Sequence, residues 1–391
     1  WRVVGVSEDE VANSKTSTFD GMYGGESGRC EGKRTSVIGE GPTWTGPIWA
    51  WGQKHGAIVG YSHSGWGLQL PDVLPGGQRG FVNYRNRPAG WNGRAADKLP
   101  DYAMPRFDGI GANEYVGTVA DGVCDFISAV DTPAIWELNI WYHTLNCGYT
   151  CRISGETDFP CIYGDRVGLG RGYVKLDKGQ PLTFDNWIQG IKAGRSYVCD
   201  GLSHLLDFEV NGLGVGEEKI AGRPSQLNAE AGDRLSIRVA AAAMLAEQPR
   251  EDLRTLRLDQ KPYWHVERAR IENTRRVPVE LIVNGQVVER REIVGDGAIN
   301  QLTFDYKPKE SCWIAIRIFP SSHTNPVFVE LDGKPIRASK RSAQWCLDAI
   351  DVCWKQKEPR TRAEEKGAAA AAYEVARQAY RRILAESTDD Q

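Results

Sequence analysis

Residues 136–171 read WELNIWYHTLNCGYTCRISGETDFPCIYGDRVGLGR, and this stretch decides the fold that we predict. Its apolar positions recur at the spacing of a helix as far as Asn146, and Gly148 follows as a helix stop. A short strand comes next and leads to Glu156 and Asp158, two carboxylates two residues apart. Carboxylates placed at the end of a strand, ahead of a proline and a glycine-rich loop, could supply half of a cation site.

The segments before this stretch extend the same pattern of helices and buried strands. Pro47 opens a short helix, and the apolar run 56–61 (GAIVGY) follows as a buried strand that ends close to His63. A second strand, at 124–130, leads to the helix of the opening stretch, for which we expect Thr132 to be the N-cap. Helices followed by buried strands resemble the units of an α/β barrel, in which strand ends line the site. His63 is therefore a candidate metal ligand, although a histidine bonded to loop backbone fits its position as well.

The segments after the opening stretch first continue this pattern. A strand is expected at 171–176, followed by a helix with Thr183 as its N-cap and Gly194 as its stop. At the end of the chain, amphipathic helices are expected at about 342–356 and 363–386.

From about residue 204 to residue 340 the pattern changes to alternation with a period of two. Asn-Gly pairs at 211–212 and 284–285 each follow an alternating run, and Asn-Gly is the strongest short signal for a hairpin. Five to eight such strands with hairpin turns predict a β-sandwich. The predicted fold is α/β plus all-β, and its three parts are a partial α/β barrel in residues 1–203, a β-sandwich in 204–340 and C-terminal helices in 341–391.

The composition bears on the class of function. The chain has 391 residues, 41% of them hydrophobic and 25% charged, which is typical of a globular protein of two or three units. The net charge of −3, from 48 basic and 51 acidic residues, gives no electrostatic reason to expect a nucleic-acid partner. No apolar run approaches the roughly 20 residues that span a bilayer. The chain starts at Trp1 within what reads as a strand, so we expect it to begin inside a longer protein.

Cysteine and tryptophan usage leaves two alternatives open. Nine cysteines occur without a Cys-x-x-Cys pair, which favours free or buried thiols over a zinc cluster. Thirteen tryptophans favour core packing, but rings in loops can also stack on sugars. This supports a second hypothesis, a non-catalytic protein that binds a glycan or another polymer. The tryptophans in or near long loops are Trp44, Trp49, Trp51, Trp66 and Trp91.

Three further residues are candidates for the site. Glu114 and His143 could add metal ligands, although a core position with a hydrogen-bond partner is the commoner role for a histidine on an apolar helix such as that of His143. Arg171 could contact an oxyanion or phosphate, or form a salt bridge with the nearby acidic residues.

The order of four motifs resembles the carbaryl-hydrolase (CehA/McbA) branch of the PHP metallohydrolases, the superfamily of polymerase-associated and histidinol-phosphatase domains. The resemblance covers roughly residues 1–212, and the following sandwich and helices look like the accessory region of long bacterial members. The motifs are residues 141–148 (WYHTLNCG), 155–158 (GETD), 170–174 (GRGYV) and 193–201 (AGRSYVCDG).

The resemblance implies a distorted α/β barrel that holds two or three divalent ions, Zn, Mn or Fe, at its strand ends. Such sites hydrolyse phosphoester or carboxyl-ester-type bonds of a small-molecule substrate with a metal-activated water. His63 matches the family's mid-barrel ligand histidine, and Asp158 matches the aspartate of its late turn. Glu156 would then be a ligand or general base. Export of long members implies a periplasmic or extracytoplasmic location.

The chain departs from the family pattern at two places, which opens the question of a rearranged or degenerate site. The early His-x-His strand is absent, and Phe159-Pro160 stands where the late turn normally continues to a histidine. Where a carboxylate often follows the second strand, this chain offers Asp125, Ser128 and Asp131.

Overall fold

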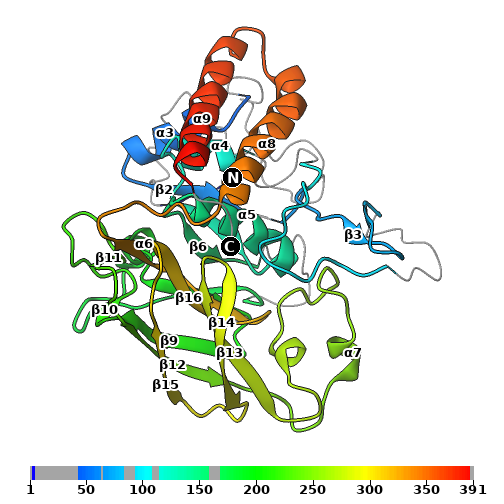
Figure 1. The fold of residues 1–391 in the computed structure, drawn as a ribbon, viewed down its shortest axis with the longest axis vertical. Helices are drawn as coiled ribbons and strands as arrows, with labels where there is room; N and C mark the ends of the chain where they lie inside the picture. The colour runs from blue at the N-terminus through cyan, green and yellow to red at the C-terminus, as the bar shows by residue number, and fades with distance from the viewer. Residues whose placement is uncertain are drawn as a thin grey trace.

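The computed structural model describes residues 43–62, 65–82, 93–107, 114–157 and 168–387, together with the backbone of residues 2–4. These parts of the chain contain seven α-helices and several β-sheets, and the described strands close into no barrel (Figure 1). No helix in the described ranges is long and apolar enough to cross a bilayer.

A parallel sheet forms the part of the fold in which we predicted the site. The strands β2 and β5 are buried along their whole length, as their apolar sequences predicted. On one face, Ile188 of α6 packs against Ile58 and Phe126. Trp141 of α5 belongs with Ile127 to a different core cluster, so the sheet lies between α6 and α5. The elements are β2 (Ile58–Tyr61), β5 (Phe126–Ala129) and β6 (Arg152–Gly155), all parallel, β1 (Arg2–Val4), antiparallel to β2, α5 (Ala134–Asn146) and α6 (Phe184–Ala193).

The ends of the two helices test the capping predictions. Thr183 caps α6 by accepting a hydrogen bond from Asn186 N, and Gly194 ends it in the left-handed conformation, so both predictions are confirmed. The prediction that Thr132 caps α5 is wrong. Pro133 is the N-cap and makes no side-chain cap bond, and the Thr132 hydroxyl bonds to the Glu137 side chain in the first turn of α5 and to Gly65 N.

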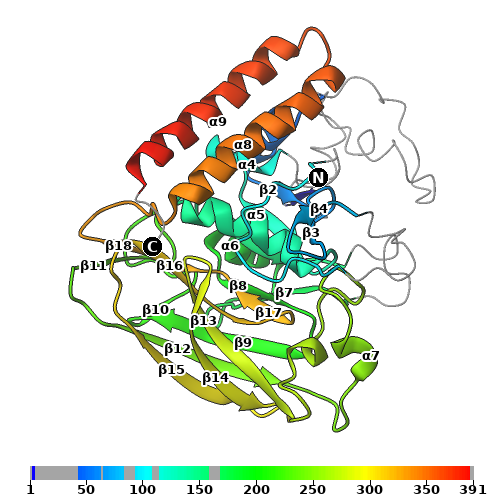
Figure 2. The same ribbon diagram turned by 45° about the vertical axis from the view of Figure 1, so that its right-hand side comes forward.

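Four further helices, α3, α4, α8 and α9, lie on the side of the parallel sheet away from the larger sheets (Figures 1 and 2). The two C-terminal helices α8 and α9 run side by side and pack on α4 and α5 (Figures 1 and 2). Both were predicted, with ends that differ by a few residues. Their bounds are α3 (Gly46–Lys54), α4 (Tyr115–Ala120), α8 (Lys340–Lys357) and α9 (Lys366–Glu386).

Two larger sheets make up most of the rest, and side chains from both form a single buried cluster, for example Ile237 and Phe304 from one sheet and Leu281 and Ile316 from the other. One sheet has the order β10 (Leu213–Gly214), β9 (Ser203–Val210), β12 (Leu235–Ala243), β15 (Asn300–Tyr306). The other has the order β11 (Gln226–Ala229), β18 (Val327–Leu331), β16 (Cys312–Ile318), β17 (Ser322–Thr324), β8 (Ser196–Cys199), β7 (Arg171–Val174), and β13 (Arg276–Val283) joins β16 to β14 (Gln286–Val294). The short strands β3 (Asp72–Val73) and β4 (Arg79–Gly80) form a separate hairpin, and α7 (Glu251–Arg254) lies in the connection from β12 to β13.

The Asn-Gly hairpins are confirmed. Asn211 and Gly212 connect β9 to β10, and Asn284 and Gly285 connect β13 to β14. All four residues have positive φ, which is the backbone conformation that makes Asn-Gly the preferred pair in a two-residue hairpin turn.

The predicted division into three parts stays a prediction, and one sheet crosses its first boundary. β8 lies before residue 203, yet it pairs in antiparallel register with β17, so that Cys199 is opposite Ser322. Asn325 also donates to the carbonyl oxygens of Ser196 and Ile153 and accepts from Ile153 N, which ties β6 to β8.

Candidate functional site

The three parallel strands end at the same edge of their sheet. We call Ser62, residues 128–132, Glu156 and Thr157 the carboxyl edge. In open α/β folds, ligands bind outside the carboxyl ends of the strands. His63 and Asp158 are the next residues in sequence after Ser62 and Thr157, and both lie outside the described residues.

Ser128 connects the three strands at this edge. Its hydroxyl lies 2.9 Å from Tyr61 O and 2.5 Å from Glu156 Oε1, and it can donate a hydrogen bond to either oxygen. Glu156 N also donates to Ala129 O at 3.1 Å. Glu156 is therefore placed on the edge by both its backbone and its side chain, in agreement with its predicted position at the end of a strand.

The turn after β5 has a strained backbone. Val130 has a φ of 91°, which is a true outlier for a β-branched residue. Asp131 follows and is fully buried. Strain of this kind gathers at functional sites, because the surrounding structure must hold it in place. Asp125, by contrast, accepts from Val59 N at 2.8 Å at the opposite end of β5, so of these two carboxylates Asp131 is the one at the carboxyl edge.

Arg171 begins the strand that lies next to β6. A Cβ atom at Gly155 would lie 2.2 Å from Arg171 O, so only glycine allows this approach. The guanidinium is exposed, and it donates to Gly168 O at 2.6 Å and to the Tyr173 hydroxyl at 3.2 Å. The hydrogen bond to Tyr173 raises the pKa of Arg171. The described hydrogen bonds of the Arg171 guanidinium are therefore not with Glu156. They do not support the alternative that Arg171 forms a salt bridge with the nearby acidic residues.

Glu114, a candidate metal ligand, holds three elements together through its described contacts. Its carboxylate is 4% exposed and accepts from Thr45 N at 2.8 Å and from the Thr45 hydroxyl. Its other oxygen accepts from the Tyr373 hydroxyl at 2.9 Å. Because both oxygens bond to groups on either side, the carboxylate joins the start of α3 and the start of α4 to α9.

His143 lies in the core, which is the commoner of the two roles that we expected for it. Its side chain is fully buried, and its ring nitrogens lie 3.0 Å from the Ser342 hydroxyl and 3.0 Å from Asp101 O. The ring stacks on Trp345 with centroids 4.1 Å apart. Neither nitrogen faces the carboxyl edge, so a metal there would find no ligand in His143.

We expect His143 to make the protein sensitive to acid. Burial lowers its pKa to about 3, so the neutral ring contributes stability that is complete above the unfolded pKa near 6.5 and is lost as the pH falls toward 3. In urea unfolding between pH 6.5 and pH 4, wild type should lose up to about 1.4 kcal/mol per pH unit more than His143→Gln. Parallel curves for the two proteins would contradict this prediction.

Two of the five tryptophans proposed for glycan binding lie in the core or against it, and Trp44 and Trp51 are only partly buried. Trp49 is fully buried against Tyr61, and Trp66 packs between Trp136 and Tyr263. Trp91 lies outside the described residues.

Glu137 is the important residue that our reading of the sequence missed. It is 2% exposed and lies in the first turn of α5, beneath the strained turn after β5. Burial raises its pKa to about 8, and hydrogen bonds from Thr132, Val130 and Trp264 oppose the rise. The sequence did contain a signal for this role, because Glu137 is a single carboxylate with apolar residues on both sides in a helix.

The carboxyl edge carries two carboxylate residues, which are of a type that divalent ions bind. Glu156 and Asp131 bring carboxylates to neighbouring strand ends, and carboxylates together with histidine suit Zn, Mn or Fe. No group of three or more His, Cys, Asp or Glu side chains arranged for a metal occurs within the described ranges, which omit His63 and Asp158. No family model, curated protein or solved structure matches the chain.

Proposed function

We propose that this protein is a metal-dependent hydrolase that cleaves a phosphoester or carboxyl-ester-type bond at the carboxyl edge. The observation that carries the proposal is the meeting of three features at the ends of neighbouring parallel strands. These features are the Glu156 carboxylate after β6, the buried Asp131 after β5 and the strained Val130 that directly precedes Asp131. The resemblance of the four sequence motifs to the carbaryl-hydrolase branch supports the same reaction class.

In this proposal Asp131 and Glu156 are metal ligands from the described part of the chain. His63 and Asp158 complete the set on the strength of their sequence positions and of the family resemblance. The bound metal would supply a water of lowered pKa and a positive charge for the developing oxyanion. Hydrogen bonding to Ser128 orients the Glu156 carboxylate, either as a ligand or as a base that takes a proton from water.

Arg171 would bind a negatively charged group of the substrate. Its guanidinium is exposed, and the bonds to Gly168 O and to the Tyr173 hydroxyl fix its direction. A positive charge that is already held in place stabilises an oxyanion more than a mobile charge does, because the mobile charge must first be reoriented. A partial barrel of the PHP type, an accessory β-sandwich and an extracytoplasmic location belong to the same proposal.

The proposal predicts a stoichiometric transition metal in the purified full chain and hydrolysis of p-nitrophenyl phosphate or of a carboxyl-ester analogue. Glu156→Gln should weaken Mn²⁺ binding about 10- to 100-fold and lower kcat/KM by about 10²-fold or more, because it removes a charged oxygen from the site. Elemental analysis, Mn²⁺ titration and steady-state kinetics provide the measurements.

Glu289→Gln is the matched control. Glu289 lies on β14, far from the carboxyl edge in the topology, and pairs with Arg291. Its substitution should leave metal content and kinetics unchanged. Wild type without bound metal and without activity on either substrate class would disprove the proposed function, and so would an unchanged Glu156→Gln variant.

A further inference from the structure

A single buried carboxylate holds the turn that carries Asp131. Glu137 accepts from Val130 N at 3.1 Å and from Trp264 Nε1 at 2.9 Å through one oxygen. Its other oxygen accepts from Thr132 N at 3.0 Å and from the Thr132 hydroxyl. The two residues on either side of Asp131 therefore both donate their backbone N–H groups to Glu137. This arrangement opposes relaxation of the positive φ of Val130.

The loop after β2 is tied to the same turn. The Thr132 hydroxyl donates to Glu137 and accepts from Gly65 N at 2.8 Å. A Cβ atom at Gly65 would lie 2.5 Å from that hydroxyl oxygen, so the loop and the turn are in close contact. The strand ends of β2 and β5 thus share one hydrogen-bond network, which runs from Gly65 through Thr132 to Glu137.

The fourth donor to Glu137 comes from a distant part of the chain. Trp264 lies in residues 250–269, between β12 and β13, which we call the arm. In Figures 1 and 2 the arm is the yellow-green segment that includes α7 and extends from the large sheets toward β3. Arg257 anchors it there by an ion pair of 2.5 Å with Asp72, which is 1% exposed. Tyr263 lies edge-on to Trp66 with centroids 6.3 Å apart.

We propose that the arm is part of the functional site and that Trp264 is a positioning residue, which acts through Glu137 to hold Asp131 in place for ligand binding. The part of this inference that concerns ligand binding at Asp131 rests on the proposed function. Trp264 touches no reacting group. Its side chain is 2% exposed, and its N–H completes the set of donors that keeps the Glu137 carboxylate directed at the turn. Ligands supported by outer hydrogen bonds of this kind lose affinity when the supporting group is removed.

Trp264→Phe tests the inference, because it keeps an aromatic ring and removes the N–H. We expect the amides of Val130 and Thr132 to exchange hydrogen about tenfold faster in the full chain, since one of the buried hydrogen bonds that hold the Glu137 side chain against the turn is lost. Mn²⁺ binding should weaken about 10- to 100-fold, and kcat should fall with little change in KM. Hydrogen exchange followed by mass spectrometry, Mn²⁺ titration and steady-state kinetics provide these readouts.

Trp313→Phe is the matched control. Trp313 is also fully buried, and its Nε1 donates to Asn146 Oδ1 at 2.7 Å. Its substitution removes one buried indole hydrogen bond outside the carboxyl edge, so exchange at Val130 and Thr132 and the affinity for Mn²⁺ should not change. If both variants change these readouts equally, the effect is general destabilisation and the inference is wrong.

Thr132→Val and Thr132→Ser keep the test decisive if Trp264→Phe fails to fold. Thr132→Val removes the hydroxyl that bonds to both Glu137 and Gly65 and should accelerate exchange at Val130, whereas Thr132→Ser should restore it. Unchanged exchange at Val130 in Trp264→Phe and in Thr132→Val would disprove the positioning role. Faster exchange with unaltered Mn²⁺ affinity would disprove the link to the site. Wild type that binds no Mn²⁺ would disprove the proposed function and with it that link, and the exchange result would still decide whether Trp264 holds the turn.

Discussion

Glu280→Ala is expected to lower the free energy of unfolding by about 3–5 kcal/mol, because it leaves the buried Arg317 guanidinium without its carboxylate. Glu280 Oε2 accepts from Arg317 Nε at 2.7 Å, and the two side chains are 8% and 10% exposed. Arg317 Nη1 donates to the Tyr142 hydroxyl at 3.2 Å, and this neutral partner does not replace the lost charge. The midpoint and slope of urea unfolding give the change.

The double variant Glu280→Leu/Arg317→Met separates the buried charge from the loss of packing. A buried ion pair replaced on both sides by apolar groups of similar size costs little, so this variant should regain most of the stability. The pair also joins β13 to β16 and, through Tyr142, to α5. A double variant as unstable as Glu280→Ala would show that the uncompensated charge is not the cause.

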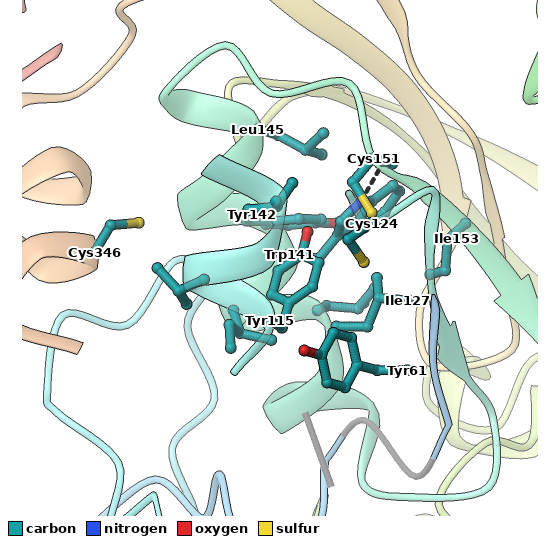
Figure 3. Packing of buried hydrophobic residues seen from close by; sticks show 14 of the residues in the cluster. Tyr61, Tyr115, Cys124, Ile127, Trp141, Tyr142, Leu145, Cys151, Ile153 and Cys346 are labelled. Carbon is teal, nitrogen blue, oxygen red and sulfur yellow. Dashed lines mark hydrogen bonds between the residues drawn. The ribbon is translucent and has the colours of Figure 1, made fainter. Parts of the chain in front are cut away.

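Trp141→Ala is the second variant for which we expect a loss of about 3–5 kcal/mol, here because it opens a large cavity. Trp141 is fully buried in α5, and Figure 3 shows its ring among the side chains of both the helix and the sheet. Its Nε1 donates to Cys151 O at 2.9 Å, which fixes the helix against the start of β6. The substitution removes this bond together with the packing, and thermal and urea unfolding both measure the result.

Trp51→Ala is the control for tryptophan removal in general. Trp51 is partly exposed on α3, where its ring lies 4.6 Å from the ring of His55. Its replacement should cost less than about 1 kcal/mol, as is usual for substitutions outside the core. If Trp141→Ala and Trp51→Ala lower the free energy of unfolding equally, the stabilising role that we assign to the burial of Trp141 is wrong.

Local sequence signals predicted the elements of this fold well. Thr183 and Gly194 mark the ends of α6, and the Asn-Gly pairs mark two hairpin turns, because caps and turns depend on a few adjacent residues. The short strand that leads to Glu156 was also predicted, and it is β6.

Long-range contacts account for what the sequence did not predict. Thr132 is a good N-cap in isolation, but its hydroxyl bonds to Gly65, which is distant in sequence. His143 and Glu114 carry groups suited to metal binding, and they are used instead by Ser342 and Tyr373 from the C-terminal helices. The role of Glu137 depends on Trp264 in the same way. No periodicity or local motif specifies such partners.

The pairing of β8 with β17 has a consequence for folding during synthesis. A ribosome releases Tyr197 and Cys199 long before Ser322 and Thr324, so β8 leaves it with one edge lacking its native partner. Pairings between segments so far apart in sequence form slowly, because a long loop must close before they form. Until then an apolar strand edge is open to wrong contacts, and we expect chaperones to bind the nascent chain at β8.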